Sequence, residues 1–506
     1  MPDTPLVSSP SRRLLALWLA LGALLLMFAM GRNAFAPAAW LAPVFLLRYT
    51  RQVRKKSALI FAWLVMFGAF LFQFRGMVLM PLPGILATSA GSALCGILPF
   101  IIDRWATRRF TSFASSLIFP CALTAVDFST NLSPFGSWGV LGYSQYGDLP
   151  LMQLAAVTGI YGISFLVAWL GSAVNWAWDQ GFKWGRIRLG AAIFIVVLAT
   201  VYLSGSVRLL ESIPLGGTQR VAALAANSQW RFLNRSVEDR FWSGDALTAD
   251  ELAPTRTWLA TQTDLLLARS ESAAQAGARL VLWSEGATSV LKADESSLLA
   301  RAAETARRNQ IYLGLAYRSF DPRTSKLHQN KLVLIGPDGS KIFEYWKSRP
   351  VPGREKESTE TNGNQMHYAD TPLGRIGGFI CFDLDFPSMV RQAGRSHTDL
   401  MIVPANDWAA IDPWHTEMAA FRAIENGCML VRDVSHGRSL AVDYLGRTLG
   451  ETDFFQDSRH ILLVDVPTHG VRTFYSRCGD LFAWLCVLSL VVVLVVRWQR
   501  KPSPSV

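Results

Sequence analysis

Residues 377–387 read Gly377-Gly378-Phe379-Ile380-Cys381-Phe382-Asp383-Leu384-Asp385-Phe386-Pro387. An apolar, β-favouring run ends here on a cysteine, and polar and helix-starting residues follow it. This pattern predicts a strand that places a thiol at the rim of a sheet, where a substrate can reach it. A free cysteine is usually a small buried apolar residue, and a reactive one needs a base or a positive charge beside it. Cys381 is therefore a candidate nucleophile only if other strands bring such groups to it.

Two other apolar runs end on the charged groups that a reactive thiol needs. Glu285 follows the run Leu280–Trp283 and precedes a glycine, and Lys347 follows the run Ile342–Trp346 and precedes a loop rich in proline and glycine. A carboxylate can take the proton of a thiol, an ammonium group can stabilise a thiolate and an oxyanion, and a thiolate can attack an acyl carbon. We therefore predict a catalytic set of Glu285, Lys347 and Cys381 at three strand ends.

The order of these three residues resembles that of the nitrilase, or carbon–nitrogen hydrolase, superfamily. The resemblance implies a four-layer αββα sandwich, and it implies supporting roles for two acidic residues. Glu355, eight residues after the lysine, matches an acidic position that the superfamily has beside the triad. Asp383, two residues after the cysteine, stands where an acid is typical of the family, and we expect it to order the active-site turn.

The region around these residues alternates predicted strands and helices, which argues for a layered α/β domain. The predicted strands are Val221–Ala225, Leu280–Trp283, Ile311–Tyr317, Lys331–Ile335, Lys341–Tyr345, Ile376–Cys381, Leu400–Pro404, Met429–Val434, Ser439–Tyr444 and His460–Val466. The predicted helices are Thr257–Ala276, Glu295–Asn309 and Trp414–Asn426. The residues Gly336-Pro337-Asp338-Gly339 predict a hairpin between two of the strands. Asn330 precedes one of them, and we interpret it as a turn residue.

The composition of the whole chain excludes a plain soluble enzyme. Of 506 residues, 51% are hydrophobic and 17% are charged, and the mean hydropathy is +0.24. Leu14–Met30 is an uninterrupted apolar run, just long enough to span a bilayer core. No small-residue cleavage site follows it and further apolar segments do, so we interpret it as a retained anchor rather than a signal peptide.

Seven further apolar segments predict a polytopic α-helical membrane bundle of about eight spans. They are Ala34–Leu47, Ala58–Phe74, Gly84–Ile102, Ser112–Val126, Met152–Trp178, Leu189–Val207 and Leu481–Val496, of which Ala34–Leu47 and Ser112–Val126 are short for a full span. We therefore predict a bundle of seven spans in residues 1–217, a nitrilase-like catalytic domain in residues 218–468, and a final span with a cytoplasmic tail in residues 469–506.

The positive charges agree with one orientation of this bundle. If the N-terminus is cytoplasmic, the inner loops carry sixteen lysines and arginines: Arg12, Arg13, Arg48, Arg51, Arg54, Lys55, Lys56, Arg104, Arg108, Arg109, Lys183, Arg186, Arg188, Arg497, Arg500 and Lys501. The short outer loops carry Arg32 and Arg75, so the positive-inside rule is obeyed. We assign the net charge of +11 to topology and anionic lipid contact, and not to nucleic acid. An odd number of spans then predicts a periplasmic catalytic domain and two cytoplasmic termini in a bacterial inner membrane.

An aromatic, glycine-rich and uncharged loop at residues 133–146 ends in Gly142-Tyr143-Ser144-Gln145 and precedes the last two spans before the catalytic region. With the span count and the position of the α/β domain, it is similar to the apolipoprotein N-acyltransferase family. That resemblance implies transfer of a fatty acyl chain from a phospholipid, through a thioester on Cys381, to the α-amino group of an S-diacylglyceryl cysteine at an apolipoprotein N-terminus. It puts Trp230 near the acyl pocket, and the alternative for this residue is an ordinary half-buried aromatic side chain. We expect a monomer that works at the lipid bilayer.

Metal and disulfide signals are weak. The seven histidines form no HExxH or paired spacing and no CxxC occurs, so we predict neither a metal nor another cofactor. Cys381 and Cys428 are the cysteines of the catalytic region. A bond between them would remove the nucleophile, so we predict that they do not pair.

The chain departs from the acyltransferase pattern at several positions. The family usually has Cys-Tyr-Glu where this chain has Cys381-Phe382-Asp383, a His where it has Arg349, and an aromatic pair near Ala409-Ala410. These changes leave the Glu, Lys and Cys chemistry intact and concern the acceptor. Three alternatives therefore stay open: an acyltransferase with a different amine acceptor, a membrane-tethered nitrilase-type amidase acting on a small amide, and a catalytically silent binding or assembly protein.

Overall fold

The computed structural model describes residues 10–53, 55–211, 216–226, 248–321 and 327–499. The contacts divide the chain into two compact units: unit 1 comprises Met1–Ser133, Ser137–Arg208 and Asp480–Val506, and unit 2 comprises Pro134–Gly136 and Leu209–Gly479. This division follows contacts, whereas the boundaries after residues 217 and 468 follow composition and remain a prediction.

Unit 1 is helical. Its elements are α1 (Arg12–Met27), α2 (Ala36–Gln52), α3 (Ser57–Phe74), α4 (Leu82–Thr107), η1 (Phe113–Leu117), α5 (Ile118–Thr130), η2 (Leu141–Gln145), α6 (Leu149–Met152), α7 (Ala155–Thr158), α8 (Ile160–Asp179), α9 (Trp184–Glu211) and α17 (Leu481–Gln499). Among the described residues, five helices are long and apolar enough to cross a membrane: Ser57–Phe74, Leu82–Thr107, Phe113–Thr130, Ile160–Asp179 and Trp184–Leu210. The length and composition of these five helices indicate a membrane protein. The three further spans predicted from the sequence remain a proposal.

The apolar segment predicted to begin at Met152 becomes a long helix only from Ile160 onward. The apolar run Met152–Trp178 does not form a single helix, because Gly159 has a φ of 66° and ends α7. An α-helix cannot continue through a residue in that conformation. The long helix α8 therefore begins only at Ile160, and two short helical turns precede it.

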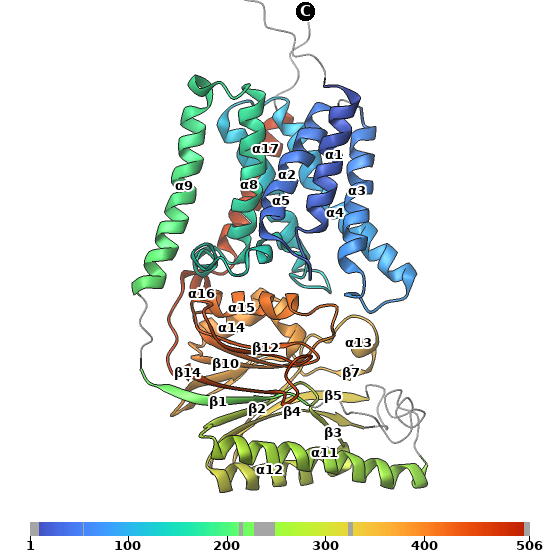
Figure 1. The fold of residues 1–506 in the computed structure, drawn as a ribbon, viewed down its shortest axis with the longest axis vertical. Coiled ribbons are helices and arrows are strands. Elements are labelled where there is room, and N and C mark those ends of the chain that lie inside the picture. Colours follow the sequence, from blue (N-terminus) through green and yellow to red (C-terminus); the bar gives the residue numbers. More distant parts are fainter. Residues whose placement is uncertain (1–9, 54, 212–215, 227–247, 322–326, 500–506) are drawn as a thin grey trace, which may run out of the picture. The chain divides into compact units, whose positions relative to one another are not determined.

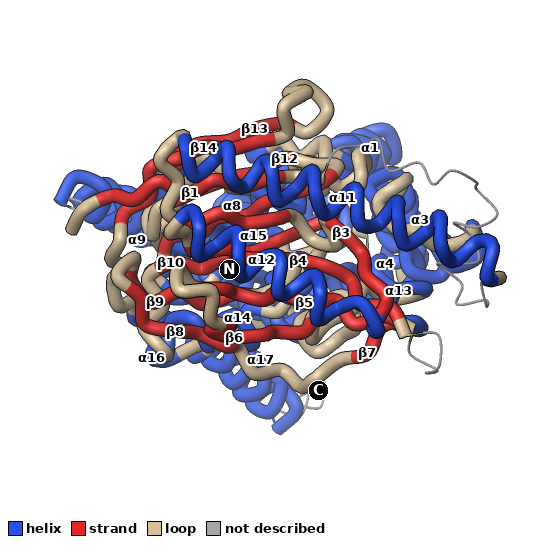
Figure 2. The backbone as a smooth tube through the Cα atoms, turned by 90° about the horizontal axis from the view of Figure 1, so that it is seen from below, coloured by secondary structure: helices blue, strands red, loops and turns tan. Residues whose placement is uncertain are grey.

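Unit 2 contains two sheets. The first has the order β14-β1-β2-β4-β5-β6, with β3 beside β4 and β7 beside β5, and the second has the order β13-β12-β11-β10-β9-β8. The strands are β1 (Thr218–Leu224), β2 (Leu280–Trp283), β3 (Thr288–Leu291), β4 (Tyr312–Phe320), β5 (His328–Ile335), β6 (Lys341–Trp346), β7 (Thr359–Glu360), β8 (His367–Thr371), β9 (Gly374–Gly378), β10 (Leu400–Asn406), β11 (Met429–Ser435), β12 (Arg438–Val442), β13 (Thr448–Asp453) and β14 (Ile461–Pro467). Figure 1 shows the strands stacked as two layers within this unit, and Figure 2 shows the strands from below, with two helices, α11 (Ala249–Gln275) and α12 (Glu295–Asn309), crossing in front of them.

Helices cover the outer faces of both sheets, so unit 2 is an αββα sandwich (Figure 1). α11 (Ala249–Gln275) and α12 (Glu295–Asn309) pack on the first sheet, and α14 (Pro387–Arg395) and α15 (Trp414–Asn426) lie on the second. The remaining elements are η3 (Lys292–Asp294), α13 (Arg354–Ser358), η4 (Cys381–Asp385) and α16 (Phe474–Cys478). The apolar core under α11 and α12 includes Trp283, Leu313 and Tyr317, all fully buried. Burial of such side chains stabilises the fold by about 1.5–3 kcal/mol each.

Parallel pairing determines which residues share one edge of the second sheet. β10 pairs in parallel with β9 and with β11. The carboxyl ends of these three strands therefore lie at the same edge, which is where ligands bind in open α/β sheets. Residues that follow β9 and β10, Cys381 and Asp407 among them, are brought to this edge by the topology.

Most of the elements predicted for this unit are present, and some predictions are wrong in detail. The hairpin is confirmed, because β5 and β6 pair in antiparallel across residues 336–340. The strand predicted as Ile376–Cys381 ends earlier, at Gly378, and Cys381 instead begins the short helix η4. The prediction missed β8 and β13, whose residues are mostly exposed or half-buried and too polar to read as strands.

Gly378 provides a test of the packing between the two sheets. An added Cβ there would lie 2.5 Å from Leu332 Cδ2 and 3.1 Å from the carbonyl oxygen of Ile402. We expect Gly378→Ala to lower the free energy of unfolding by about 1–3 kcal/mol, because the closely packed sheets must separate. Thermal unfolding of the detergent-purified protein measures this. Gly217→Ala is the control, since nothing lies within 4 Å of its Cβ position, and equal melting temperatures for both variants would contradict the expectation.

Candidate active site

Glu285 lies two residues after β2, and its carboxylate is buried against both sheets. Its Oε1 accepts hydrogen bonds from Lys347 Nζ at 2.8 Å and from Asn330 Nδ2 at 2.6 Å. Its Oε2 accepts from the backbone N–H of Asn406, at the end of β10, at 2.9 Å. Burial alone raises the pKa of Glu285, but the positive charges of Lys347 and Arg318 outweigh it and lower the pKa below its usual value. The carboxylate is therefore ionised and can accept a proton.

Lys347 follows β6 directly and is as deeply buried as its partner. Its Nζ donates to Glu285 and also to both carboxylate oxygens of Glu355, at 2.7 Å and 3.0 Å. Burial alone lowers the pKa of Lys347, but the charges of Glu285 and Glu355 raise it well above its usual value. Glu355 Oε2 also accepts from the backbone N–H of Val351 at 2.7 Å, so it fixes the loop that carries the lysine. The structure thus brings together Glu285, Lys347 and Glu355.

Cys381 lies at the start of η4 with a φ of 50°, in the left-handed region that residues other than glycine rarely adopt. Such strained residues are concentrated at functional sites, where the surrounding structure holds them. The side chain is 3% exposed. Burial and the charge of Glu285 raise the pKa of the thiol well above its usual value, and the charge of Lys347 opposes this. The resting thiol is therefore protonated and within the electrostatic reach of both predicted partners.

Asp383 ties the turn that carries the thiol to the loop that carries the lysine. Its carboxylate accepts from the backbone N–H of Ile380 at 3.0 Å, from the backbone N–H of Arg349 at 2.7 Å, and from the hydroxyl of Tyr345 at 2.8 Å. Burial raises the pKa of Asp383 to about 7. These bonds have the geometry of a residue that orders the turn after Cys381.

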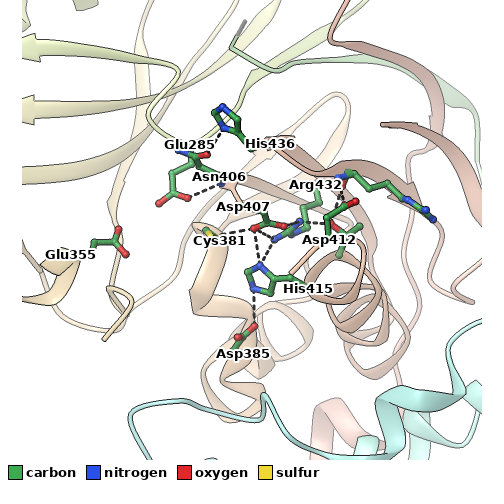
Figure 3. Close-up of polar contacts among 12 residues, drawn as sticks. Glu285, Glu355, Cys381, Asp385, Asn406, Asp407, Asp412, His415, Arg432 and His436 are labelled. Carbon is green, nitrogen blue, oxygen red and sulfur yellow. Dashed lines mark hydrogen bonds and ion pairs between the residues drawn. The ribbon is translucent and has the colours of Figure 1, made fainter. Parts of the chain in front are cut away.

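A second buried charge network lies beyond the thiol, and sequence analysis missed it (Figure 3). The Cys381 sulfur lies 4.0 Å from Asp407 Oδ1. Arg432 donates to both oxygens of Asp407 at 3.0 Å. His415 Nδ1 lies 2.8 Å from Asp407 Oδ1, and its Nε2 lies 3.1 Å from Asp385 Oδ1. Asp407, which follows β10 of the second sheet, therefore lies beside the thiol, and the charge of Glu285 from the first sheet also acts on it.

His415 is a cation in this network. Nε2 faces the carboxylate of Asp385, and Nδ1 lies 2.8 Å from both Asp407 Oδ1 and Arg432 Nη2. Burial alone lowers the pKa of His415, but the charges of Asp407 and Asp385 outweigh it and raise the pKa to about 9. Likewise, although burial favours the neutral acid, Arg432 and His415 hold the pKa of Asp407 well below its usual range.

The sequence analysis also assigned roles to Asn330 and Trp230. Asn330 is not a turn residue: it lies within β5, is 1% exposed, and holds the Glu285 carboxylate. The interpretation was wrong because an asparagine before an apolar run also suits a strand that points a polar side chain into a site. Trp230 lies outside the described residues.

Cys381, Asp407 and His415 each offer a ligand atom, and these atoms lie within 4.8 Å of one another. Arg432 already binds Asp407, and its Nη2 lies 2.8 Å from His415 Nδ1. A cation would meet this buried positive charge, so we assign no metal to the cluster. Cys381 and Cys428 are free thiols.

Unit 2 therefore combines an αββα sandwich with a buried Glu-Lys pair and a cysteine on a strained turn. The carbon–nitrogen hydrolase family model matches residues 251–475, which cover the region of this site. The model of the apolipoprotein N-acyltransferase N-terminal domain matches residues 22–173 of the helical unit. A solved amidase from Nesterenkonia sp. is similar over 54% of this chain and 97% of its own, with 19% identity and a TM-score of 0.41.

Curated relatives are similar over nearly the whole chain. An apolipoprotein N-acyltransferase of Geobacter metallireducens is 27% identical over 95% of each chain. Those of Azotobacter vinelandii and Chlorobaculum tepidum are 25% and 24% identical, over 85% and 92% of this chain and 83% and 92% of theirs. This chain belongs to the apolipoprotein N-acyltransferase family, and its C-terminal part matches the carbon–nitrogen hydrolase model.

The charge on His415 predicts how stability depends on pH. Its folded pKa of about 9 lies above the value of about 6.5 expected in the unfolded chain. Its pairing with Asp407 and Asp385 therefore stabilises the fold fully below about pH 6.5, and this stabilisation is lost as pH rises through about 9. The difference of roughly 2.5 units corresponds to about 3 kcal/mol.

We expect His415→Gln to be least stable relative to the wild type near pH 6 and to approach it near pH 10. Melting temperatures measured across this range test the expectation. The exposed residue His397 provides a matched control as His397→Gln. A stability gap for His415→Gln that is constant from pH 6 to pH 10 would show that His415 is not charged in the fold.

Proposed function

We propose that this protein is an N-acyltransferase that completes the lipid modification of apolipoproteins. It transfers a fatty acyl chain from a membrane phospholipid, through a thioester on Cys381, to the α-amino group of an N-terminal S-diacylglyceryl cysteine. The observation that carries the proposal is the pairing of Glu285 with Lys347 near a protonated buried thiol, in a chain whose two units match the two parts of the acyltransferase family.

The first step forms the acyl-enzyme. As Cys381 attacks the ester carbonyl of the phospholipid, the ionised carboxylate of Glu285 takes the thiol proton. Lys347 and the backbone amides after Cys381 stabilise the oxyanion of the tetrahedral intermediate. The carbon–oxygen bond to the glycerol then breaks, the leaving oxygen takes a proton from Glu285, and a lysophospholipid departs. The acyl chain remains on the sulfur as a thioester.

The second step passes the chain to the acceptor. The α-amine of the diacylglyceryl cysteine attacks the thioester carbonyl, and Glu285 takes the proton that the amine loses. The carbon–sulfur bond breaks, the thiolate is reprotonated, and an amide is formed. Glu355 and Asp383 contact Lys347 and the turn after Cys381, so we assign them positioning roles. Trp230 is proposed for the acyl pocket by resemblance alone.

The setting of the reaction follows from its substrates. Both the donor and the acceptor carry acyl chains that stay in the bilayer, which suits a catalytic domain joined to apolar helices. We propose eight spans in the bacterial inner membrane, a periplasmic catalytic domain, cytoplasmic termini, and a monomer. A small-amide hydrolase would need no such helices, so the apolar helical unit and the names of the relatives favour the acyltransferase.

The covalent step can be tested directly. After exposure to phospholipid vesicles, we expect mass spectrometry of the purified protein to show a fatty-acyl thioester on Cys381. Cys381→Ser should lack it, and cells that depend on this variant should accumulate diacylated lipoproteins. Cys428→Ser is the matched control, because burial raises the pKa of that thiol to about 12 and it should remain unmodified. A normal N-acylated lipoprotein profile in the Cys381→Ser cells would refute the mechanism.

The proposed topology can be tested by labelling single cysteines in whole cells with a membrane-impermeant maleimide. The background replaces the exposed residues Cys95 and Cys478. We expect Arg75→Cys and Ser458→Cys to be labelled from outside and Arg186→Cys only after the cells are permeabilised. Labelling of Arg186→Cys in intact cells would reverse the orientation or change the number of spans.

A further inference from the structure

Arg349 lies two residues after Lys347, in the loop that follows β6. Its backbone N–H donates to Asp383 Oδ1 at 2.7 Å, so its main chain is fixed to the turn that carries the thiol. Its guanidinium lies over the ring of Phe386, 4.9 Å from the centroid. Phe386 ends the same turn, five residues after Cys381. The cation is thus held between the two loops that carry Lys347 and Cys381.

The charge of this guanidinium is not compensated within the part of the chain that the structure describes. Arg349 Nε is buried and has no hydrogen-bond partner, and no carboxylate of a described residue pairs with its side chain. Arg349 is half-buried. The fully buried Arg432 likewise has an Nε without a partner, but its charge is paired with Asp407. A buried donor without an acceptor costs about 1–3 kcal/mol, and more when it is charged. Such a residue is suited to an acceptor that arrives with a ligand.

A further segment of unit 2 packs beside the turn that carries Phe386. Pro134–Gly136 belong to the same compact unit as the site. Gly136 has a φ of 59°, and a Cβ there would lie 2.5 Å from the carbonyl oxygen of Asp385, the residue before Phe386. The apolar helix α5 ends at Thr130, six residues before Gly136. Within unit 2, residues 134–136 therefore pack against the turn that ends at Phe386.

We propose that Arg349, stacked on Phe386, binds the phosphodiester of the acyl-donor phospholipid. This inference rests on the proposed function and adds to it a headgroup subsite. An arginine fork binds two phosphate oxygens at once, and its stacking on an aromatic ring holds the plane of the fork. In a phospholipid, only the glycerol unit separates the phosphate from the ester carbonyl that Cys381 attacks. The diacylglyceryl group of the acceptor has no phosphate, so the subsite acts on the donor.

The test separates binding from acyl transfer. The full-length protein in neutral detergent is titrated with a diether phosphatidylglycerol, whose ether bonds cannot be attacked, and with the matching diether glycerol, which lacks the phosphate. The variants are Arg349→Gln, Arg349→Lys and, as a control, Arg256→Gln, an exposed arginine paired with Asp294. Each variant keeps the backbone N–H, so the bond to Asp383 persists.

We expect Arg349→Gln to raise the Kd for the diether phospholipid by roughly 10- to 100-fold, the loss typical of a charge-assisted hydrogen bond. Arg349→Lys should lose less, and Arg256→Gln should bind as the wild type does. All variants should bind the diether glycerol with similar affinity. Equal Kd values for wild type and Arg349→Gln would overturn the proposal, as would an equal loss for both lipids. Displacement of the lipid by inorganic phosphate at comparable concentration would overturn its assignment to a lipid headgroup.

Thioester formation on Cys381 is measured separately with the ester phospholipid. Its absence in the wild type would refute the proposed acyl transfer while the titration still decides the subsite. A phospholipid-dependent thioester together with an unchanged Kd in Arg349→Gln would retain the function and remove the subsite. The thioester measurement therefore tests the proposed acyl transfer, and the titration tests the proposed phosphate subsite.

Discussion

The site depends on the burial of one carboxylate between two sheets. Glu285 accepts hydrogen bonds from β5, from the residue after β6 and from the backbone at the end of β10. Removing one partner of such a buried ion pair costs about 3–5 kcal/mol, because it leaves a charge uncompensated. The ionised glutamate therefore fixes the lysine, and through the backbone of Asn406 it also fixes the edge of the sheet that precedes Asp407. The chemistry proposed for the thiol is possible because this carboxylate is charged and held before any substrate arrives.

Sequence periodicity predicted the layered α/β domain well, because its central strands are short apolar runs with polar ends. β2 and α15 have the predicted bounds, and the hairpin between β5 and β6 followed from its turn residues. The strand before Cys381 was predicted too long. Residues 379 and 380 are apolar and fully buried, and the backbone N–H of Phe379 still donates to the carbonyl of Ile402 in β10 at 3.3 Å. Hydropathy alone cannot show that β9 ends at Gly378 and that the chain turns into η4 at Cys381. In the helical unit, hydropathy located the apolar helices but not the break at Gly159, which is a matter of backbone conformation.

The three residues of the catalytic set could be proposed from sequence because each follows an apolar run directly. The second network could not. Asp407 follows a strand in the same way and might have been noticed, but His415 lies in a helix and Arg432 within a strand, where a charged residue usually indicates an exposed face. Only the parallel pairing of β10 with β11 and the packing of α15 on the second sheet bring them together. Their charges are then explained by mutual pairing, which no linear pattern records.

The hydrogen bonds of Asp383 have a mechanical consequence. One carboxylate joins the backbone before the thiol, the backbone two residues after Lys347, and the hydroxyl of Tyr345 in β6. The segments that carry the nucleophile and its electrostatic partner are therefore joined through one buried side chain, although they belong to different sheets. A displacement of the lysine loop would therefore break these bonds or move the turn that carries the sulfur with it. The attacking atom and the stabilising charge are thus mechanically coupled.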